Sequence, residues 1–396
     1  MALRLSAQSF WRRWRPVIVD LFNQWPWIYP RGIEPSARRW VERARAKVGW
    51  YRSLRSDWLT EIYLGNVEIH SPPEDLPAAA RRAFSAVGSR SYPDASVSFL
   101  HGANLFSNEG LVLTRDNHVL SQYYHQFGTK LLWHRFLRHP FSLTRTQVTR
   151  VDDVLALLAA PQGWNYYHWL FDVLPRLHLL TRWRSVIEKY AVPENVNAVQ
   201  LETLQLLGLA TEQLHFLKAG QRLRCQSLYV PSLPGSESCY PPWSLEFLRS
   251  SFLPISASIA GQGPRIYIQR GASAQRPILN ESELIAVLEK RGFTVVALER
   301  HSFREQVAIF RDARLVVAAH GAGLANLIFS GNQAALLELF SSDYMRPDCY
   351  FTLARRIGVA YDCWLDDVPA GTRKPWGAIL ADLPVITQKL DQLEKL

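Results

Sequence analysis

Residues 314–340 read RLVVAAHGAGLANLIFSGNQAALLELF, and the architecture of the chain can be worked out from them. The apolar run over residues 315–319 predicts a buried strand, which ends at His320. A glycine-containing turn follows, then a helical pattern over residues 322–329 and a second apolar run over residues 334–339. Strand, glycine turn, helix and strand form a βαβ unit of the kind that binds nucleotides.

The turn of this unit has the features of a phosphate site. Its two glycines allow the backbone to approach a bound group, and the helix start offers N–H donors to a phosphate. The turn residues assigned to the phosphates are Gly321, Ala322, Gly323 and Leu324. His320 ends the strand at the mouth of the predicted pocket, where it can hydrogen-bond a phosphate or a sugar hydroxyl. Glu338, near the tip of the second strand, is predicted to accept a ribose hydroxyl.

The same unit would also suit a dinucleotide, so an NAD(P)-linked oxidoreductase is an alternative. Asn326 stands where the third glycine of G-x-G-x-x-G would be, which weakens that alternative. The position of the unit late in the chain weakens it further, because dinucleotide fingerprints usually lie at the first βα turn of a domain. A non-catalytic glycan-binding protein is the third possibility.

Length and composition predict a globular chain of two domains that binds an anionic partner. The chain has 396 residues, of which 48% are hydrophobic and 20% charged. Its 45 basic residues exceed its 35 acidic ones, which gives a net charge of +10. Sugar nucleotides, lipid headgroups, acidic glycans and nucleic acid would all suit that charge, and the charge alone selects none of them.

Cysteines and apolar runs give expectations about metals and cellular location. Cys225, Cys239, Cys349 and Cys363 lie far apart without a CxxC pair, which predicts scattered core thiols rather than a zinc site or disulfides. No apolar run approaches the roughly 20 residues of a membrane span. The first residues, MALRLSAQSFWRRWRP, lack the uninterrupted apolar core of a signal peptide. We therefore expect a cytoplasmic protein.

Residues 1–60 differ in composition from the rest, because arginines and tryptophans alternate along them. Two helical pieces are predicted, separated by Pro26 and Pro30. One interpretation is peripheral contact with an anionic membrane surface at the inner membrane, with rings at the headgroups and arginines on anionic lipid. The other is a basic helix packed on the body. Nucleic acid is not expected as a partner, because no recognised binding module follows.

The remaining chain divides into a β-rich lead-in over residues 61–150 and regular α/β alternation afterwards. Such alternation predicts doubly wound parallel sheets that bind ligands beyond the carboxyl ends of their strands. The expected domains are the basic segment 1–60, an N-terminal acceptor-side lobe 61–258, a nucleotide-sugar-binding lobe 259–380 and a C-terminal helix 381–396.

Basic and polar residues follow the strand predicted over residues 265–269. Arg270 stands at its carboxyl end, Arg276 comes six residues later, and Asn280 precedes the next helix. An arginine at a strand tip can clamp a diphosphate and neutralise the charge of a leaving group. We assign these three residues to donor binding.

A second polar cluster lies in the sequence NYYHWLFD. On a helix, Asn165, His168 and Asp172 fall at positions i, i+3 and i+7 and share one face. Either His168 or Asp172 can act as a general base toward an attacking hydroxyl. Asn165, together with the ring-bearing Tyr167 and Trp169, is predicted to face the acceptor.

These motifs together resemble the family-61 glycosyltransferases over about residues 150–345. The resemblance rests on NYYHWLFDVLPRL, on IYIQRG with the later arginine and asparagine, on SFREQVAIFRDARLVVAAHGAGLANLIF and on LLELF. The matching residues are Asn165, His168, Asp172, Arg270, Arg276, Asn280, Glu305, Gln306, His320, Gly321, Leu324 and Asn326. The basic segment and the β-rich lead-in lie outside it.

The resemblance implies sugar transfer from a nucleotide-diphosphate donor to an acceptor hydroxyl. It also implies two Rossmann-like lobes in a GT-B-like arrangement, inversion at the anomeric carbon, and no metal or other cofactor. The chain has no D-x-D metal motif, in agreement with that expectation. Without a signal or anchor, the expected role is that of a bacterial enzyme of capsular or other surface-polysaccharide biosynthesis, with a glycan or lipid-linked acceptor.

Overall fold

The computed structural model describes most of the chain from residue 148 onward and shorter parts before it. The described ranges are 32–34, 36–39, 42, 58–69, 83–84, 89–106, 109–123, 148–235, 238–270, 276–366 and 376–395. Most of residues 1–60 lies outside them, and so do the predicted helical pieces and their membrane contact. Within that segment the described part includes a strand, β1 (Gly32–Glu34), and the start of β2 (Trp58–Tyr63), which crosses the predicted boundary at residue 60.

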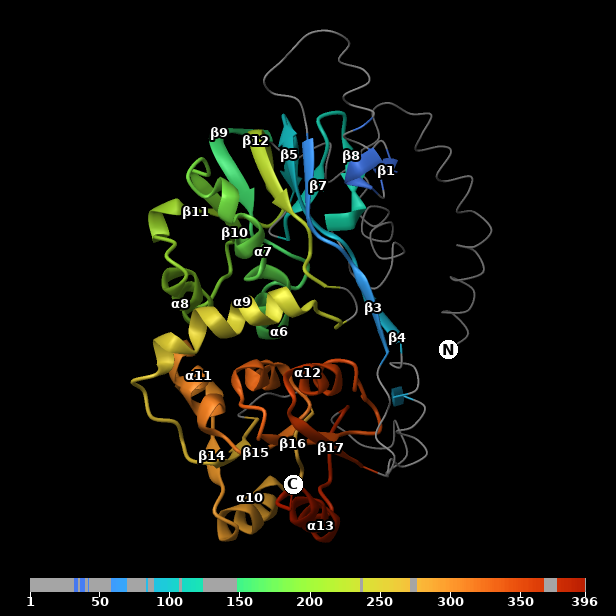
Figure 1. Ribbon diagram of the computed structural model, residues 1–396, viewed down its shortest axis with the longest axis vertical. Coiled ribbons are helices and arrows are strands. Elements are labelled where there is room, and N and C mark those ends of the chain that lie inside the picture. The colour runs from blue at the N-terminus through green and yellow to red at the C-terminus, as the bar shows by residue number, and fades with distance from the viewer. Residues whose placement is uncertain are drawn as a thin grey trace, which may run out of the picture.

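The first half forms a ten-stranded mixed sheet (Figure 1). Its parallel part consists of β9 (Val148–Leu157), β10 (Lys189–Pro193), β11 (Leu214–Leu217) and β12 (Arg222–Pro231). The lead-in supplies the antiparallel part: β5 (Ala95–His101), β6 (Asn104–Phe106), β7 (Leu111–Leu113) and β8 (His118–Leu120), with β2 on β5. At the edge of this part, β1 pairs with β8 in parallel. A separate ribbon pairs β3 (Asn66–Ile69) with β4 (Ser89–Tyr92). The β-rich prediction for this region is confirmed, and the lead-in completes the sheet of the following residues.

The helix expected to carry Asn165, His168 and Asp172 is divided in the structure. It consists of α6 (Tyr166–His168), a π-helical turn η2 (Trp169–Val173), α7 (Arg176–Leu179) and the 3₁₀ turn η3 (Thr181–Trp183). The Leu174 N–H donates to the Trp169 carbonyl at 3.1 Å, five residues back, which widens the turn. Pro175 then interrupts the ladder because it has no N–H. This half also contains two longer helices, α8 (Ala198–Leu206) and α9 (Pro242–Phe252).

The second half forms a five-stranded parallel sheet in the order β14-β13-β15-β16-β17. The strands are β13 (Arg265–Ile268), β14 (Thr294–Val296), β15 (Leu315–Ala319), β16 (Ala335–Phe340) and β17 (Ala360–Leu365). The strands predicted over residues 265–269, 315–319 and 334–339 are confirmed as β13, β15 and β16, each within one residue of the predicted bounds. The chain first moves outward from β13 to β14 and then returns to the other side of β13. The strand order therefore reverses between β13 and β15, where doubly wound sheets bind their ligands.

Helices cover both faces of this second sheet, as its apolar strands require. Along β15, Val316 packs on the side of α11 (Phe303–Asp312) and α12 (Tyr350–Ile357). The next residue, Val317, packs on the opposite side with α10 (Glu281–Lys290) and α13 (Leu383–Leu393). The C-terminal tail thus contains the predicted helix, and α13 packs on the sheet through Ile386 and Leu390.

The two halves share a continuous hydrophobic core. One cluster of buried side chains contains Ala156 and Leu248 from the first half and Val316 and Leu327 from the second. Figure 1 shows α9 and α6 between the two sheets, facing α11 and α12. The predicted α/β class with parallel sheets is confirmed, and the two-lobed GT-B arrangement stays a prediction.

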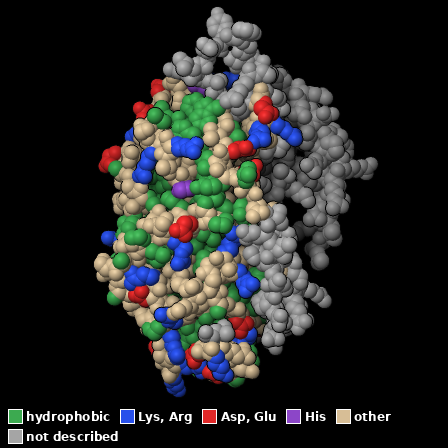
Figure 2. Space-filling model, viewed as in Figure 1, with side chains coloured by type: hydrophobic (Ala, Val, Ile, Leu, Met, Phe, Trp, Pro, Cys, Tyr) green, Lys and Arg blue, Asp and Glu red, His purple; other side chains and the backbone are tan. Residues whose placement is uncertain are grey.

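The surface and the thiols agree with a globular chain. Figure 2 shows basic and acidic side chains interspersed over the visible face of the described residues. Cys225, Cys239 and Cys363 are buried and Cys349 is half-buried, all as free thiols, which confirms the predicted scattered core thiols. Over the described ranges, none of the helices is both long enough and apolar enough to span a bilayer.

Candidate functional site

The carboxyl ends of β13 and β15 meet where the strand order reverses. These strands pair in parallel, with Ile268 opposite Ala318, so the residues that follow them lie at the same edge of the sheet. Arg270 follows the first strand and His320 follows the second. The Arg270 guanidinium donates through Nη1 to the His320 main-chain oxygen at 2.5 Å. The structure thus brings together two residues that the sequence assigned to the donor, at the position where this class of sheet binds ligands.

Two arginines gather positive charge at this edge of the sheet. Burial, and after it the charge of Arg276, lower the pKa of Arg270 to about 10. Arg276 packs its guanidinium 4.6 Å from the centroid of the Tyr344 ring, and its buried Nε has no hydrogen-bond partner among the described residues. Within the described ranges neither arginine forms an ion pair with a carboxylate. Two neighbouring guanidiniums in this state favour a bound anion such as a diphosphate.

His320 is held from behind by a buried carboxylate. Its Nδ1 lies 2.6 Å from Glu338 Oε1, and the Tyr361 hydroxyl donates to Glu338 Oε2 at 2.6 Å. Because a carboxylate accepts hydrogen bonds, Nδ1 carries the proton, and Nε2 is the nitrogen left for a ligand. Glu338 has no exposed surface. The predicted contact between Glu338 and a ribose hydroxyl is therefore corrected: both of its oxygens are engaged, and the residue positions His320.

The glycine turn owes its glycines to close packing. Gly321 has an extended backbone with φ of −179°, and a Cβ there would lie 3.2 Å from Arg270 Nη1. A Cβ on Gly323 would lie 2.8 Å from the Leu298 side chain. The predicted helix is the 3₁₀ helix η7 (Ala322–Phe329), which begins at the half-buried Ala322.

Three residues of the donor assignment are engaged inside the protein. Leu324 is buried, and its N–H donates to the Gly321 carbonyl at 3.1 Å, so it is not available to a phosphate. The Asn280 side chain donates through Nδ2 to the Ala381 carbonyl at 2.9 Å, and its Oδ1 accepts from the Ala381 N–H at 2.9 Å. Asn326 has no exposed surface. The predicted donor contacts of the buried Leu324 and Asn326 are corrected to roles in holding the site together, and that of the half-buried Asn280 stays a prediction.

Asn326 ties the glycine turn to the first half of the chain. Its Oδ1 accepts from the Tyr166 hydroxyl at 2.6 Å, and its Nδ2 donates to Gln306 Oε1 at 3.0 Å and to the Gly323 carbonyl at 3.2 Å. Tyr166 belongs to α6, whereas Asn326 belongs to η7. This hydrogen-bonded path fixes η7 against the helix that carries the second polar cluster.

That second cluster is a histidine–aspartate pair supported by a tyrosine. His168 Nδ1 lies 2.7 Å from Asp172 Oδ2, and the Tyr240 hydroxyl donates to Asp172 Oδ1 at 3.0 Å. The His168 side chain is 27% exposed and that of Asp172 15%. Asp172 thus has both oxygens engaged, while His168 keeps Nε2 for a substrate. Of the two residues that sequence left as alternatives, the geometry favours His168 as the base and Asp172 as the group that orients it.

The predicted acceptor-side residues have internal contacts. Asn165 caps α6 by accepting from the Tyr167 N–H at 2.9 Å. Trp169 has no exposed surface, and its Nε1 donates to Thr203 Oγ1 at 2.9 Å. Tyr167 is 7% exposed. The widened π turn directs Trp169 into the core, which corrects its predicted contact with an acceptor.

Tyr167 instead joins the two polar clusters. Its ring lies 5.4 Å from the His168 ring and 5.8 Å from the Tyr350 ring, edge-on in both cases. Tyr350 in turn lies 5.4 Å from the His320 ring and donates to the Gly321 carbonyl at 2.6 Å. The clusters of His168 and His320, far apart in sequence, are therefore neighbours across a pair of tyrosines.

Sequence reasoning missed Tyr240, Tyr350 and Tyr361, although each holds a polar group of the site. Tyr361 lies in β17, and Tyr350 is the first residue of α12. Their partners are 23 to 68 residues away in sequence, so no local pattern signalled these contacts.

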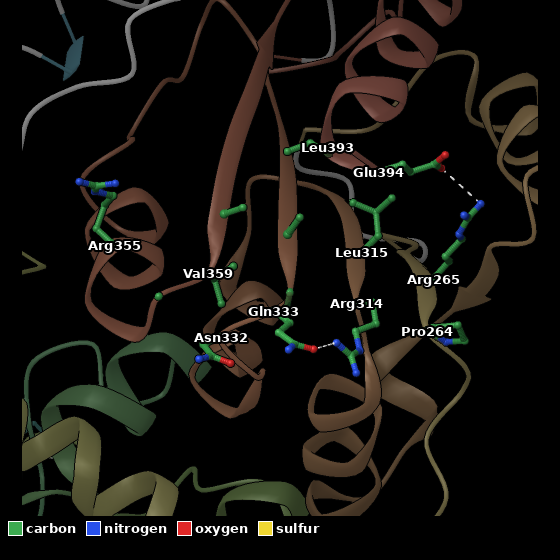
Figure 3. A pocket seen from close by; sticks show the side chains of 14 residues that line it. Pro264, Arg265, Arg314, Leu315, Asn332, Gln333, Arg355, Val359, Leu393 and Glu394 are labelled. Carbon is green, nitrogen blue, oxygen red and sulfur yellow. Dashed lines mark hydrogen bonds and ion pairs between the residues drawn. The ribbon is translucent and has the colours of Figure 1, made fainter. Parts of the chain in front are cut away.

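A groove of about 580 Å³ lies at the opposite edge of the second sheet. Figure 3 shows Leu315 and Val359 beside the amino ends of β15 and β17, with Arg314 bonded to Gln333. Arg265 and Glu394 form an ion pair at 3.2 Å on another side of the groove. Because Arg270 and His320 follow the carboxyl ends of the strands, this groove is separate from the candidate site.

Comparison with known proteins agrees with the geometry. A family model described as "Glycosyltransferase 61" matches residues 166–348, which contain His168, Asp172, Arg270 and His320. The EGF domain-specific O-linked N-acetylglucosamine transferase of Drosophila melanogaster is 42% identical over 92 residues, 22% of this chain and 17% of that protein. The protein of that name in Pan troglodytes is 32% identical over 117 residues, covering 27% of this chain and 22% of the relative.

A second kind of relative is the protein O-linked-mannose beta-1,4-N-acetylglucosaminyltransferase 2 of Bos taurus. It is 34% identical over 114 residues, 26% of this chain and 19% of the relative. The chain therefore matches about a fifth of the length of these curated relatives. Residues 166–348 form a glycosyltransferase domain of family 61.

Proposed function

We propose that this chain transfers a sugar from a nucleotide-diphosphate donor to the hydroxyl of a glycan or lipid-linked acceptor. One observation carries the proposal. The desolvated Arg270 and the supported His320 lie at the reversal point of the second sheet, and the Tyr167–Tyr350 pair connects them to the His168–Asp172 pair. An anion site next to an oriented base suits a reaction in which a diphosphate departs while a hydroxyl attacks.

On the donor side, Arg270 and Arg276 bind the diphosphate and stabilise the charge that develops as it leaves. His320 adds a hydrogen bond through Nε2, because Glu338 holds its Nδ1. Fixed donors of this kind stabilise a transition state without reorganisation, and removing one typically costs about 10²–10³ in turnover.

On the acceptor side, His168 Nε2 takes the proton from the attacking hydroxyl. Asp172 and Tyr240 keep the imidazole in position, as the carboxylate does in other histidine-based sites. The oxygen attacks the anomeric carbon as the bond to the diphosphate breaks. A single displacement of this kind inverts the anomeric configuration.

We propose that the reaction needs no metal, because the arginines supply the positive charge that a divalent cation would bring. Over the described ranges no cluster of three or more His, Cys, Asp and Glu is arranged to hold a metal ion. We also propose that the two sheets correspond to the two lobes of a GT-B arrangement, with the donor on the second.

N-acetylglucosamine is the first sugar to test, because the relatives are named for its transfer. Their names concern EGF domains and O-linked mannose, so a protein-linked acceptor should be tested beside the glycan and lipid-linked ones. A role at the cytoplasmic face of a bacterial inner membrane, in surface-polysaccharide biosynthesis, is our proposal for the setting. It is supported by the net charge of +10 and the arginine-rich residues 1–60.

A thermal-shift screen against UDP-, GDP-, CMP- and TDP-sugars tests the proposal, beginning with UDP-N-acetylglucosamine. We expect one nucleotide class to raise the Tm, and that donor to be consumed when an acceptor is added. Stabilisation by NAD(P) with a change in nicotinamide absorbance would instead establish an oxidoreductase. Glycan binding without any turnover would establish a binding protein.

A further inference from the structure

Trp376 is an exposed indole at the donor side of the site. The side chain is 55% exposed, and its ring centroid lies 5.5 Å from that of Tyr344 at an angle of 73°. An aromatic side chain exposed beside a polar site commonly provides contact area for a ligand. Trp376 lies beyond the residues matched by the family model, which end at 348.

The turn that carries Trp376 is held firmly against the sheet. The N–H of the next residue, Gly377, donates to Asp343 Oδ2 at 3.1 Å. Gly377 has φ of 77°, and a Cβ there would lie 2.5 Å from Arg276 Cγ, so only glycine fits this contact. Two residues later Ile379 pairs with Pro277 and Leu279 through main-chain hydrogen bonds of 2.8 Å. An indole on a backbone held in this way loses less conformational freedom when a ligand binds than one on a free loop.

Tyr344 connects this indole to the cations of the site. The Arg276 guanidinium lies 4.6 Å from the Tyr344 centroid, and the His320 ring lies 5.6 Å from it. Trp376 is thus one ring away from both groups that the proposed mechanism assigns to the diphosphate. In a nucleotide a single ribose separates the base from the phosphates. The separation between base and phosphates is therefore similar in kind to that between the indole and the cations.

We propose that Trp376, backed by Tyr344, is the platform on which the base of the nucleotide donor stacks. This inference rests on the proposed function, since it names the base subsite of the same donor site. Every base has a π-face that stacks on an aromatic side chain. The phosphates then lie at Arg270 and Arg276, and the ribose lies between them and the indole.

Calorimetric titration of the full chain tests the platform with two probes. One is whichever of UDP, GDP or TDP binds the wild type most tightly, and the other is inorganic pyrophosphate, which has no base. We expect Trp376→Ala to weaken nucleotide binding about 5- to 100-fold, from the usual contribution of base stacking. Pyrophosphate binding should stay within about twofold, and Trp376→Phe should restore most of the nucleotide affinity because a ring remains.

Trp164→Ala is the matched control. Its indole is 58% exposed and lies in the first half of the chain, so its removal should leave the affinity for both probes unchanged. Equal weakening of nucleotide and pyrophosphate binding by Trp376→Ala would overturn the platform, and so would no weakening of either. A rise in the KM of the acceptor alone would also overturn it, since the ring would then serve the acceptor.

Turnover by the wild type separates this inference from the proposed function. If the wild type transfers sugar and Trp376→Ala binds the nucleotide normally, the platform fails and the function stands. If the wild type neither binds a nucleotide nor transfers sugar, both fail.

Discussion

The Arg270 guanidinium donates a hydrogen bond to the main-chain oxygen of His320, a residue 50 positions later in the chain, at 2.5 Å. This contact joins the ends of β13 and β15 at the reversal point of the second sheet. It also explains the small residue that follows His320, because a Cβ on Gly321 would lie 3.2 Å from the same guanidinium. The arginine therefore shapes the turn as well as contributing its charge.

Replacing Arg270 should separate donor binding from folding. We expect Arg270→Ala to lower turnover by about 10²–10³ and to weaken donor binding, because a fixed positive charge at the leaving group is lost. Arg270→Lys should recover little, since an ammonium group cannot reproduce a guanidinium that bonds two partners in one plane. Turnover and calorimetric donor affinity are the measurements. Arg314→Ala, on an exposed arginine at the amino edge of the same sheet, is the control and should behave like wild type.

The His168–Asp172 pair should be needed for turnover but not for donor binding. His168→Ala should lower kcat by about 10² or more, because the acceptor hydroxyl loses its base. Asp172→Asn should also lower kcat, since Asp172 orients the imidazole through a 2.7 Å contact. Donor affinity should stay near the wild-type value in both variants. His215→Ala, on β11, serves as the control histidine. Normal kcat values in both variants would remove this cluster from the mechanism.

Loss of the buried carboxylate of Glu338 should affect stability and donor binding together. We expect Glu338→Gln to lower the free energy of unfolding by about 1–3 kcal/mol, because the buried site loses the charge of the acceptor and one of its two accepting oxygens becomes an NH₂ group. Donor affinity should fall as well, since His320 loses the charged partner of its Nδ1. Urea unfolding and calorimetry measure the two effects. Tyr361→Phe removes only one hydroxyl and should be milder in both. Wild-type stability and donor affinity in Glu338→Gln would contradict the assigned role.

The bond between Tyr166 and Asn326 should couple the two halves of the chain. Tyr166→Phe removes a buried 2.6 Å hydrogen bond and should lower the free energy of unfolding by about 1 kcal/mol, with a fall in kcat. Tyr63→Phe is a matched control, because its hydroxyl also meets a distant side chain, that of His178 at 2.7 Å, but within the first half. It should lose stability without losing kcat. Equal losses of kcat would mean that the coupling is general instability.

Metal removal should leave the rate unchanged. We expect extensive treatment with a chelator to preserve turnover, because Arg270 and Arg276 carry the charge that stabilises the departing diphosphate. Initial rates before and after treatment check this. A rate that falls and returns with Mg²⁺ or Mn²⁺ would contradict the metal-independent mechanism.

Much of the fold could be predicted from local pattern. The apolar runs that became β15 and β16 are long enough and bounded clearly enough to predict buried strands. Ser302 and Glu305 form a capping box, so the start of α11 is encoded within four residues. The positions of Arg270 and His320 could be predicted for a related reason: once strands are parallel, the residues after their ends meet at one edge.

The partners of the site residues could not be predicted in this way. Glu338 resembled a ribose ligand because it lies near a strand tip, yet His320 and Tyr361, 18 and 23 residues away, occupy both of its oxygens. Asn280 finds its partner 101 residues later, in the turn region that also carries Trp376. A hydrogen bond between distant residues depends on how the elements pack. The hydrophobic periodicity of a short stretch of sequence therefore does not predict it.

Local pattern therefore established the main strands, several of the helices and the sheet edge that we propose as the ligand site, because hydrophobic periodicity and capping act over a few residues. Packing established which polar groups are engaged and which are left for a substrate. It buried Glu338 and Trp169, left Nε2 of His168 and His320 available, and placed Tyr167 against Tyr350 between them. These outcomes follow from burial and from contacts across the fold, which exist only once both sheets and the helices between them have assembled.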